Sequence, residues 1–430
     1  MLVFPGQYAE RPRDTQAQRL DAIPGHYDRV VFGAALALAC IGLVMVASSS
    51  IAIAEGLNVG PFHFLARHAL FLTGGLVLGL VLARTELKLV EKHAPMLLIF
   101  CFVLLLLVFV PGLGHTVNGA RRWIRLGISN FQVVEAVKLL LIVWMASYLK
   151  RYHNTVHVGW RTMFKPLLVA ALLVGLLLAQ PDFGSALLIC AIVGGMLWLG
   201  GASIPKLVLP AMAALPVLAW VAMSESYRVR RLTSFMNPWE DPFKDGFQLT
   251  QALIAIGRGE WFGVGLGGSV QKLFYLPEAH TDFILSVIGE ELGFVGVMTV
   301  IALFAVLAGR AFRIGLRAVE MRRLFSGFCA FGVGLWISLQ AFVSIGVNFG
   351  LLPTKGLTLP LISSGGSSVL MTCAAIGLLL RVSYELDRAT RQVARAREEL
   401  AAEDDSDGGG VSHADARGRR RVEPTLGEAA

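Results

Sequence analysis

The chain alternates long apolar runs with short polar segments. A helix that crosses the hydrocarbon core of a membrane needs about 20 mainly apolar residues, and ten runs come close to that length. We therefore predict an all-α, polytopic integral membrane protein with ten transmembrane helices. The predicted spans are 30–49, 66–83, 94–111, 131–149, 166–180, 184–201, 205–223, 283–308, 325–347 and 366–384.

Composition agrees with a chain whose solvent is mostly lipid. The 430 residues are 55% hydrophobic and only 16% charged, with a mean hydropathy of +0.65, whereas soluble domains are about a quarter charged. The net charge of +8 could indicate nucleic acid as a partner. The basic residues instead gather in alternate short loops and the C-terminal tail, which is the pattern of membrane topology and argues against nucleic acid.

The distribution of Lys and Arg predicts the orientation. Loops after spans two, four, six and eight carry thirteen, and loops after spans one, three, five and nine carry five, so both termini should be cytoplasmic. We expect a cytoplasmic tail at 1–29, a membrane domain at 30–385 and a largely disordered cytoplasmic tail at 386–430. Within the membrane domain, 224–282 should form a large extracytoplasmic loop with short re-entrant or interfacial helices.

The strongest candidate for chemistry closes that loop. Asp282 stands just before span eight, where an Asp often caps a helix. A carboxylate next to lipid is also costly unless it is used or paired, and desolvation would raise its pKa into the range of a general base. Both roles are compatible. Glu290 and Glu291 lie two turns further along and are secondary candidates.

A second charged pair opens span four. Glu135 and Lys138 are three residues apart and share a helix face. They could simply neutralise each other, or Lys138 could point at an anionic ligand together with Arg121 and Arg122, because arginine binds phosphate oxygens well.

Several further cations face outward, where the topology rule does not favour them. The segment 348–368 combines prolines and glycines at membrane depth, and such backbone must be buried or line a wet cavity. A lipid-linked phosphate beside a base would suit this face, and so would a transporter. The outward cations are Arg121, Arg122, Arg228, Arg230, Arg231, Lys272 and Lys355.

One glycine motif is discounted as a cofactor site. Residues 263–268 match GxGxxG, but no predicted strand precedes them and no βαβ unit surrounds them. We interpret these glycines as turn residues. The five cysteines lie in or beside apolar runs without a CxxC pair, so disulfides and metal ligation are not expected.

Four segments carry a resemblance to a known family: 180–184, 227–241, 276–293 and 348–368. They resemble the SEDS family of shape, elongation, division and sporulation proteins over about 30–385, and 350–360 is similar to its division members. The resemblance implies a ten-span SEDS fold and a glycosyltransferase that polymerises lipid II outside the plasma membrane at the division septum. It also implies a class B penicillin-binding transpeptidase of the FtsI type and other divisome membrane proteins as partners.

The resemblance also implies roles for single residues. The family's essential aspartate matches Asp282, which would act as catalytic base. Val133 stands where the family usually has proline, and Ser364 where tyrosine is common, which puts a ring contact there in doubt. A divalent cation, Mg²⁺ or Mn²⁺, could help to neutralise the leaving diphosphate. A lipid II flippase and a division scaffold are the alternatives. The candidate substrate-binding residues are Arg121, Arg122, Glu135, Lys138, Arg231, Lys272, His280, Glu290, Lys355 and Ser367.

Overall fold

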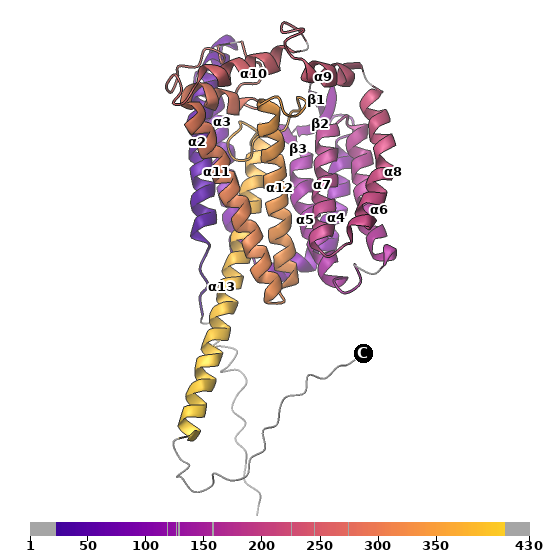
Figure 1. Cartoon of the computed structure of the whole chain (residues 1–430), viewed down its shortest axis with the longest axis vertical. Coiled ribbons are helices and arrows are strands. Elements are labelled where there is room, and N and C mark those ends of the chain that lie inside the picture. The colour runs from indigo at the N-terminus through magenta and orange to yellow at the C-terminus, as the bar shows by residue number, and fades with distance from the viewer. Residues whose placement is uncertain are drawn as a thin grey trace, which may run out of the picture. The chain divides into compact units, whose positions relative to one another are not determined.

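The protein, as a computed structural model, is mostly helical (Figure 1). The structure describes residues 23–408 except 118, 126, 128–129, 157–158, 225, 245 and 274. Residues 386–408 of the C-terminal tail, which was expected to be largely disordered, are helical, and the rest of the tail lies outside the described residues. Contacts separate a compact unit, Tyr27–Tyr384, from a second unit in which the backbone N–H of His26 donates to Asp387 Oδ2 at 2.8 Å.

Each predicted span coincides with a helix. The helices are α2 (Arg29–Gly56), α3 (His63–Arg84), α4 (Leu87–Leu107), α5 (Val133–Arg151), α6 (Trp160–Ala179), α7 (Phe183–Leu199), α8 (Ile204–Met223), α9 (Ser226–Met236), α10 (Phe247–Arg258), α11 (Ile284–Glu320), α12 (Leu324–Asn348) and α13 (Gly366–Gly408).

Among the described residues, eight helices are long and apolar enough to cross a membrane. Of the two other helices that match predicted spans, α7 is apolar but has 17 residues, and α5 has 19 residues with charges in its first and last turns. The all-α membrane class is confirmed, and the count of ten spans stays a prediction.

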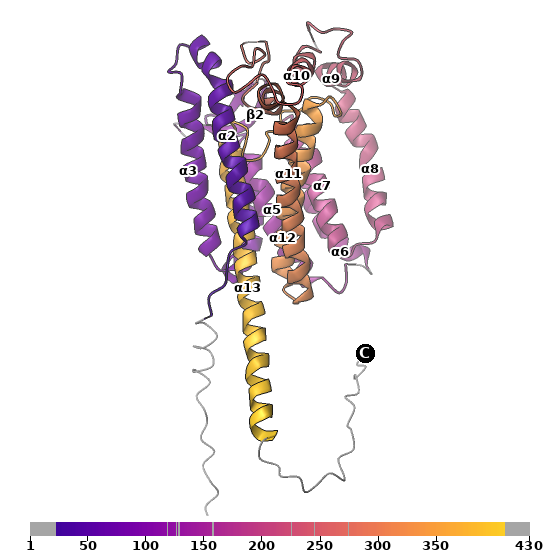
Figure 2. The same ribbon diagram turned by 60° about the vertical axis from the view of Figure 1, so that its left-hand side comes forward.

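Helices α5 and α12 form the centre of the Tyr27–Tyr384 unit. Most of their side chains are buried, and α12 packs against α5, α7 and α11. The described side chains of α8 are largely exposed, and α8 lies at the periphery in Figures 1 and 2. An apolar exposed surface on outer helices is what lipid contact requires.

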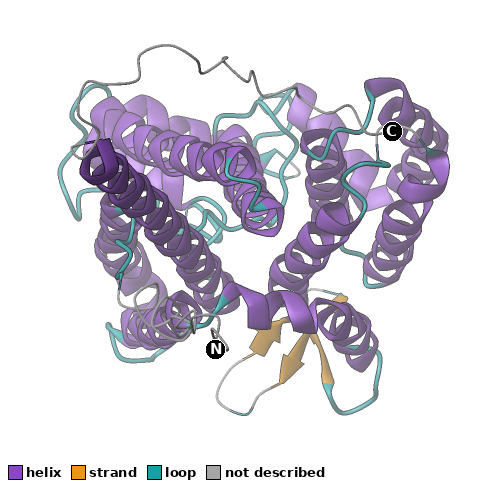
Figure 3. Cartoon of the chain, turned by 90° about the horizontal axis from the view of Figure 1, so that it is seen from below, coloured by secondary structure: helices purple, strands orange, loops and turns teal. Residues whose placement is uncertain are grey.

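A small antiparallel sheet, which hydropathy did not predict, joins α4 to α5. Its strands are β1 (Gly114–Val117), β2 (Ala120–Arg125) and β3 (Asn130–Gln132), in the order β1-β2-β3. Figure 3 shows the strands at the edge of the helices. The strands are short and polar, so they leave no apolar run. The Asn118-Gly119 pair between β1 and β2 is the sequence signal, since this dipeptide favours hairpin turns.

The glycine-rich loop after α10 packs into a break in α11. Gly293 has φ 64° and ψ −163°, a conformation that is essentially restricted to glycine. The freed backbone groups are satisfied by the loop, because Val264 N–H donates to the Glu290 carbonyl at 2.9 Å and Phe294 N–H to the Glu260 carbonyl at 2.8 Å. Gly263 has a positive φ, as the turn interpretation of this motif predicts.

Candidate functional site

Asp282 lies in the turn that leads into α11, and Asn348 at the end of α12 holds this turn. The Asn348 side chain donates from Nδ2 to the Asp282 carbonyl at 3.0 Å, and its Oδ1 accepts from Ser286 N–H at 3.1 Å and Ser286 Oγ at 2.8 Å. Asn348 is completely buried. The backbone of Asp282 is therefore fixed by a residue from another helix.

The interpretation of Asp282 as an N-cap is wrong. The N-cap position of α11 is Phe283, and no side chain of that position caps the helix. Asn348 instead satisfies the Ser286 N–H in the first turn. Among the described residues, no side-chain or backbone donor bonds to the Asp282 carboxylate, so this group is not consumed in holding the helix.

The segment between α12 and α13 lies directly against Asp282. A Cβ atom placed on Gly356 would lie 3.2 Å from Asp282 Oδ2. Ser363 Oγ donates to the Thr281 carbonyl at 2.6 Å, and Ser364 N–H donates to the His280 carbonyl at 2.9 Å. These bonds place the glycine-rich segment and the carboxylate side by side.

The surroundings change the acidity of His280 and Asp282 in this turn. Burial raises the pKa of the Asp282 carboxyl to about 7, the Glu278 carboxylate adds to the rise, and the Arg231 guanidinium acts in the opposite direction. Burial lowers the pKa of His280, whose ring packs on Phe64 with centroids 5.0 Å apart. A carboxyl with a pKa near 7 is well matched to general-base catalysis at neutral pH.

Two of the predicted cations lie near this turn. Arg231 on α9 donates to the Thr354 carbonyl at 3.5 Å, and Lys355 precedes the glycine that faces Asp282. The Lys355 ammonium lies 4.0 Å from the centroid of the Phe183 ring, at the start of α7. The structure thus brings Arg231 to the Asp282 turn and places the Lys355 ammonium on the Phe183 ring. The side chain of Arg228 lies outside the described residues.

Glu135 and Lys138 form a buried network of their own. Lys138 Nζ lies 2.8 Å from Glu135 Oε1 and donates to Gln340 Oε1 at 2.6 Å. Gln340 also accepts from Trp336 and donates to the Thr358 carbonyl at 2.9 Å. The network therefore connects α5 to the segment between α12 and α13, which also lies against Asp282. One buried acceptor in the network, Glu135 Oε2, has no described donor.

The arginines of β2 contact the ends of neighbouring helices. Arg122 donates to the carbonyls of Gln180 and Pro181, and its guanidinium lies 3.7 Å from Asp182 Oδ1. Arg121 donates to the Phe109 carbonyl at 3.4 Å. Arg122 therefore binds the turn between α6 and α7.

Ser367 ties two helix starts together. Its Oγ accepts from the backbone N–H of Gln132, which is the N-cap residue of α5, at 2.9 Å. Ser367 is buried. The start of α13 is thereby held against the start of α5, where Glu135 lies one turn further along.

Glu290 and Glu291 are each paired with a basic residue, as expected of carboxylates that stabilise the packing of the fold. Glu290 accepts from Arg258 Nη1 at 3.0 Å and from Ser269 Oγ at 2.5 Å. Glu291 accepts from Lys272 Nζ at 2.6 Å and from Ser48 Oγ at 2.7 Å. These bonds join α10, its following loop and α2 to α11. The contacts of Lys272 and Glu290 favour a role in packing over a role in substrate binding.

The candidate residues thus fall into separate groups. Asp282 and His280 belong to one turn, Arg231 lies near it, and the Glu135 and Glu290 networks share no member with this group. Sequence reasoning missed Asn348 and Gln340 as single residues because an amide gives no signal without its partners. No three His, Cys, Asp or Glu side chains in the described part of the chain lie close enough to hold a metal ion.

The fold and this site define a class: a multi-pass helical membrane protein with a partly buried carboxylate beside cations where the loop meets α11. A family model described as a cell cycle protein of the FtsW, RodA and SpoVE group matches residues 28–388. The chain belongs to this family, and the predicted SEDS resemblance is confirmed.

Curated relatives carry a more specific name. The chain is 61% identical to a probable peptidoglycan glycosyltransferase FtsW of Xanthomonas oryzae pv. oryzae, over 90% of this chain and 81% of the relative. It is 47% identical to a protein of the same name from Coxiella burnetii, over 86% of this chain and 100% of the relative.

Solved structures share the fold. One, described as the structural coordination of polymerization and crosslinking by a peptidoglycan synthase complex, has a TM-score of 0.68 at 30% identity and covers 84% of this chain and 98% of that chain. The rod shape determining protein RodA of Thermus thermophilus has a TM-score of 0.61 at 30% identity and covers 83% of this chain and 96% of that chain.

Proposed function

We propose that this chain is a peptidoglycan glycosyltransferase of the FtsW type, which polymerises lipid II into glycan strands. The names and high identity of its relatives support the activity. The observation that carries the mechanism is the Asp282 carboxylate, which is partly buried, has a pKa near 7 and receives no hydrogen bond from a described residue. Asp282 is the catalytic base.

The reaction is a single displacement. Asp282 takes the proton of the acceptor sugar 4-hydroxyl, the freed oxygen attacks the anomeric carbon of the donor, and the bond to undecaprenyl diphosphate breaks. An α-linked diphosphate then gives a β-1,4 bond with inversion, so one base is enough. Diphosphate leaves with the bonding electrons and needs positive charge more than a proton.

The cations of the site suit the leaving diphosphate. Arg231 and Lys355 flank the Asp282 turn. A guanidinium and an ammonium form charge-assisted hydrogen bonds with phosphate oxygens and stabilise the negative charge that develops on them. Arg121 and Arg122 add positive charge at β2, whereas Lys138 is buried and paired with Glu135.

The setting follows from the family. We infer a multi-pass protein of the bacterial inner membrane at the division septum, with both termini cytoplasmic. A class B penicillin-binding transpeptidase of the FtsI type, with other divisome membrane proteins, would crosslink the strands that this chain makes. The solved synthase complex supports such a pairing, because its description couples polymerization to crosslinking.

The test supplies lipid II already on the outer side of proteoliposomes. The wild-type chain with its transpeptidase should polymerise it, and Asp282→Asn should not. A flippase would move lipid II across the bilayer without forming polymer. A scaffold would support division through its tails and spans, and would tolerate Asp282→Asn.

A further inference from the structure

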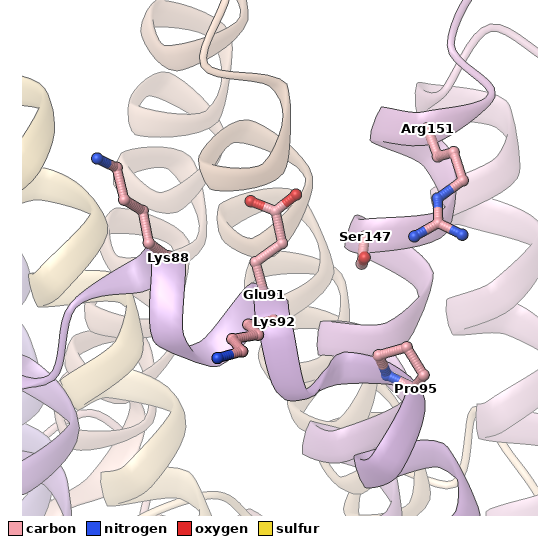
Figure 4. Close-up of a pocket in the computed structure, with 6 residues that line it drawn as sticks. All are labelled: Lys88, Glu91, Lys92, Pro95, Ser147 and Arg151. Atoms are coloured by element: carbon pink, nitrogen blue, oxygen red, sulfur yellow. The ribbon is translucent and has the colours of Figure 1, made fainter.

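A groove with no part in the proposed reaction lies between α4 and α5. It has a volume of about 310 Å³ and is lined by Lys88, Glu91, Lys92 and Pro95 of α4 and by Ser147 and Arg151 of α5 (Figure 4). The sheet joins the end of α4 to the start of α5. The groove, at the start of α4 and the end of α5, therefore lies at the opposite end of these helices from Glu135.

The two helices present these residues at helical spacing. Lys88 and Lys92 are four residues apart, as are Ser147 and Arg151, so each pair shares one helix face. Figure 4 shows the labelled side chains of α4 and α5 on the two sides of the groove. The site is thus built from two packed helices and not from a mobile loop.

The charge of the groove is not balanced. Its one acid, Glu91, pairs with Lys150 at 2.6 Å just outside the lining. Lys88, Lys92 and Arg151 have no acidic partner among the described residues, and the Ser147 hydroxyl has no hydrogen bond there. Three cations and a hydroxyl donor around a small hollow suit a phosphate group.

The apolar surface next to the groove indicates where that phosphate comes from. Met96, Ile99 and Val103 continue the face of Lys92 along α4, and their side chains are 68%, 64% and 43% exposed. Acyl chains could lie along this stripe while a headgroup occupies the groove. Basic pockets between transmembrane helices on the cytoplasmic side commonly bind anionic headgroups.

We propose that this groove is a binding site for the phosphate headgroup of an anionic phospholipid of the inner leaflet. The leaflet follows from the orientation predicted by the Lys and Arg distribution. The site is separate from Asp282 and is independent of the glycosyltransferase proposal.

The test measures lipid binding to the purified full-length chain in detergent by native mass spectrometry. Phosphatidylglycerol is the probe, phosphatidylcholine is the neutral lipid, and glycerol 3-phosphate is the soluble source of the same phosphate. The variant is Lys88→Gln/Lys92→Gln/Arg151→Gln. The matched control is Arg161→Gln/Lys165→Gln/Arg313→Gln, which removes three exposed charges from the start of α6 and the C-terminal part of α11, on the same predicted side.

We expect phosphatidylglycerol to bind the wild type and the control, and the groove variant to bind it about tenfold more weakly or worse. Ser147→Ala, which changes no charge, should also weaken binding. It tests the groove if the triple variant does not fold. Equal loss in the groove and control variants would overturn the proposal, since a general charge effect would then explain the binding. If glycerol 3-phosphate displaced phosphatidylglycerol completely, a free phosphate compound and not a lipid would be the ligand, and the proposal would be overturned.

Discussion

At the scale of single residues, the position of Asp282 depends on atoms far away in the sequence. Asn348 holds its carbonyl, Gly356 leaves room beside its carboxylate, and burial raises its pKa to about 7. As the proposed catalytic base, Asp282 has to be deprotonated to act. The raised pKa means that deprotonation occurs close to neutral pH and not near pH 4.

The pH dependence of polymerisation follows from this value. Only a small fraction of Asp282 is ionised at pH 6 and most of it at pH 8, so the rate should rise about tenfold across this range. Initial rates of lipid II polymerisation in detergent measure it. A flat profile between pH 6 and pH 8 would contradict Asp282 as the titrating base.

The raised pKa of Asp282 also affects stability. Ionisation of Asp282 should increase the rate of polymerisation, but it should lower the stability of the fold. A carboxyl whose pKa is raised in the folded state favours folding less as pH rises from about 4 to about 7. Asp282→Asn removes the buried charge, so it should raise Tm more at pH 8 than at pH 5 while it abolishes activity. Thermal unfolding at both pH values checks this, and an equal change in Tm would contradict the burial of the charge.

Asn348 offers a test of positioning. Asn348→Asp keeps the size but replaces the donor to the Asp282 carbonyl by an acceptor, and it adds negative charge near the base. We predict at least a tenfold lower kcat with a smaller change in KM, and a pH profile shifted upward. Ser344→Ala is the control, because its buried hydroxyl has no described partner. An unshifted pH profile in Asn348→Asp would contradict the role.

At the scale of elements, the hydropathy pattern located every helix that could span, because lipid selects long apolar runs. It did not locate contacts between elements. The basic partners of Glu290 and Glu291 come from Arg258 and Lys272, and Asn348 takes over the capping that Asp282 was expected to provide. Such pairings depend on which helices pack together, and no single segment of the sequence contains that information.

The break in α11 can be tested directly. Gly293→Ala would place a Cβ 2.4 Å from the Gly263 nitrogen, at a φ that side chains rarely adopt. We predict a clear fall in Tm and loss of activity. Gly309→Ala on the same helix meets nothing within 4 Å and should be neutral or slightly stabilising. A wild-type Tm in Gly293→Ala would contradict the account of the break.

Variants of the buried pair Glu135 and Lys138 on α5 can distinguish a role in packing from a role in the reaction. Lys138→Met leaves a buried carboxylate without its cation and should cost about 3–5 kcal/mol. The double variant Glu135→Gln/Lys138→Met should recover much of the lost Tm. Because the network of Lys138 and Gln340 bonds to the Thr358 carbonyl, in the segment that lies against Asp282, we predict that polymerisation does not return. Full recovery of activity in the double variant would restrict the pair to packing.

At the scale of the whole molecule, segments far apart in the sequence combine to build the site at Asp282. Asp282 precedes α11, Asn348 ends α12, Gly356 lies between α12 and α13, and Arg231 belongs to α9. A lipid tail could stay in the bilayer while its diphosphate and sugars meet these groups. The family resemblance supplied the chemistry of the substrate, which residue physics alone left open between an enzyme and a transporter.

The most direct test is polymerisation of lipid II by the purified chain, with and without its class B transpeptidase, comparing wild type with Asp282→Asn. The account predicts polymer from the wild type and a loss of at least about 10²-fold in the variant, while the variant still folds and still binds the transpeptidase. Wild-type rates from a folded Asp282→Asn protein would contradict the central role of this carboxylate.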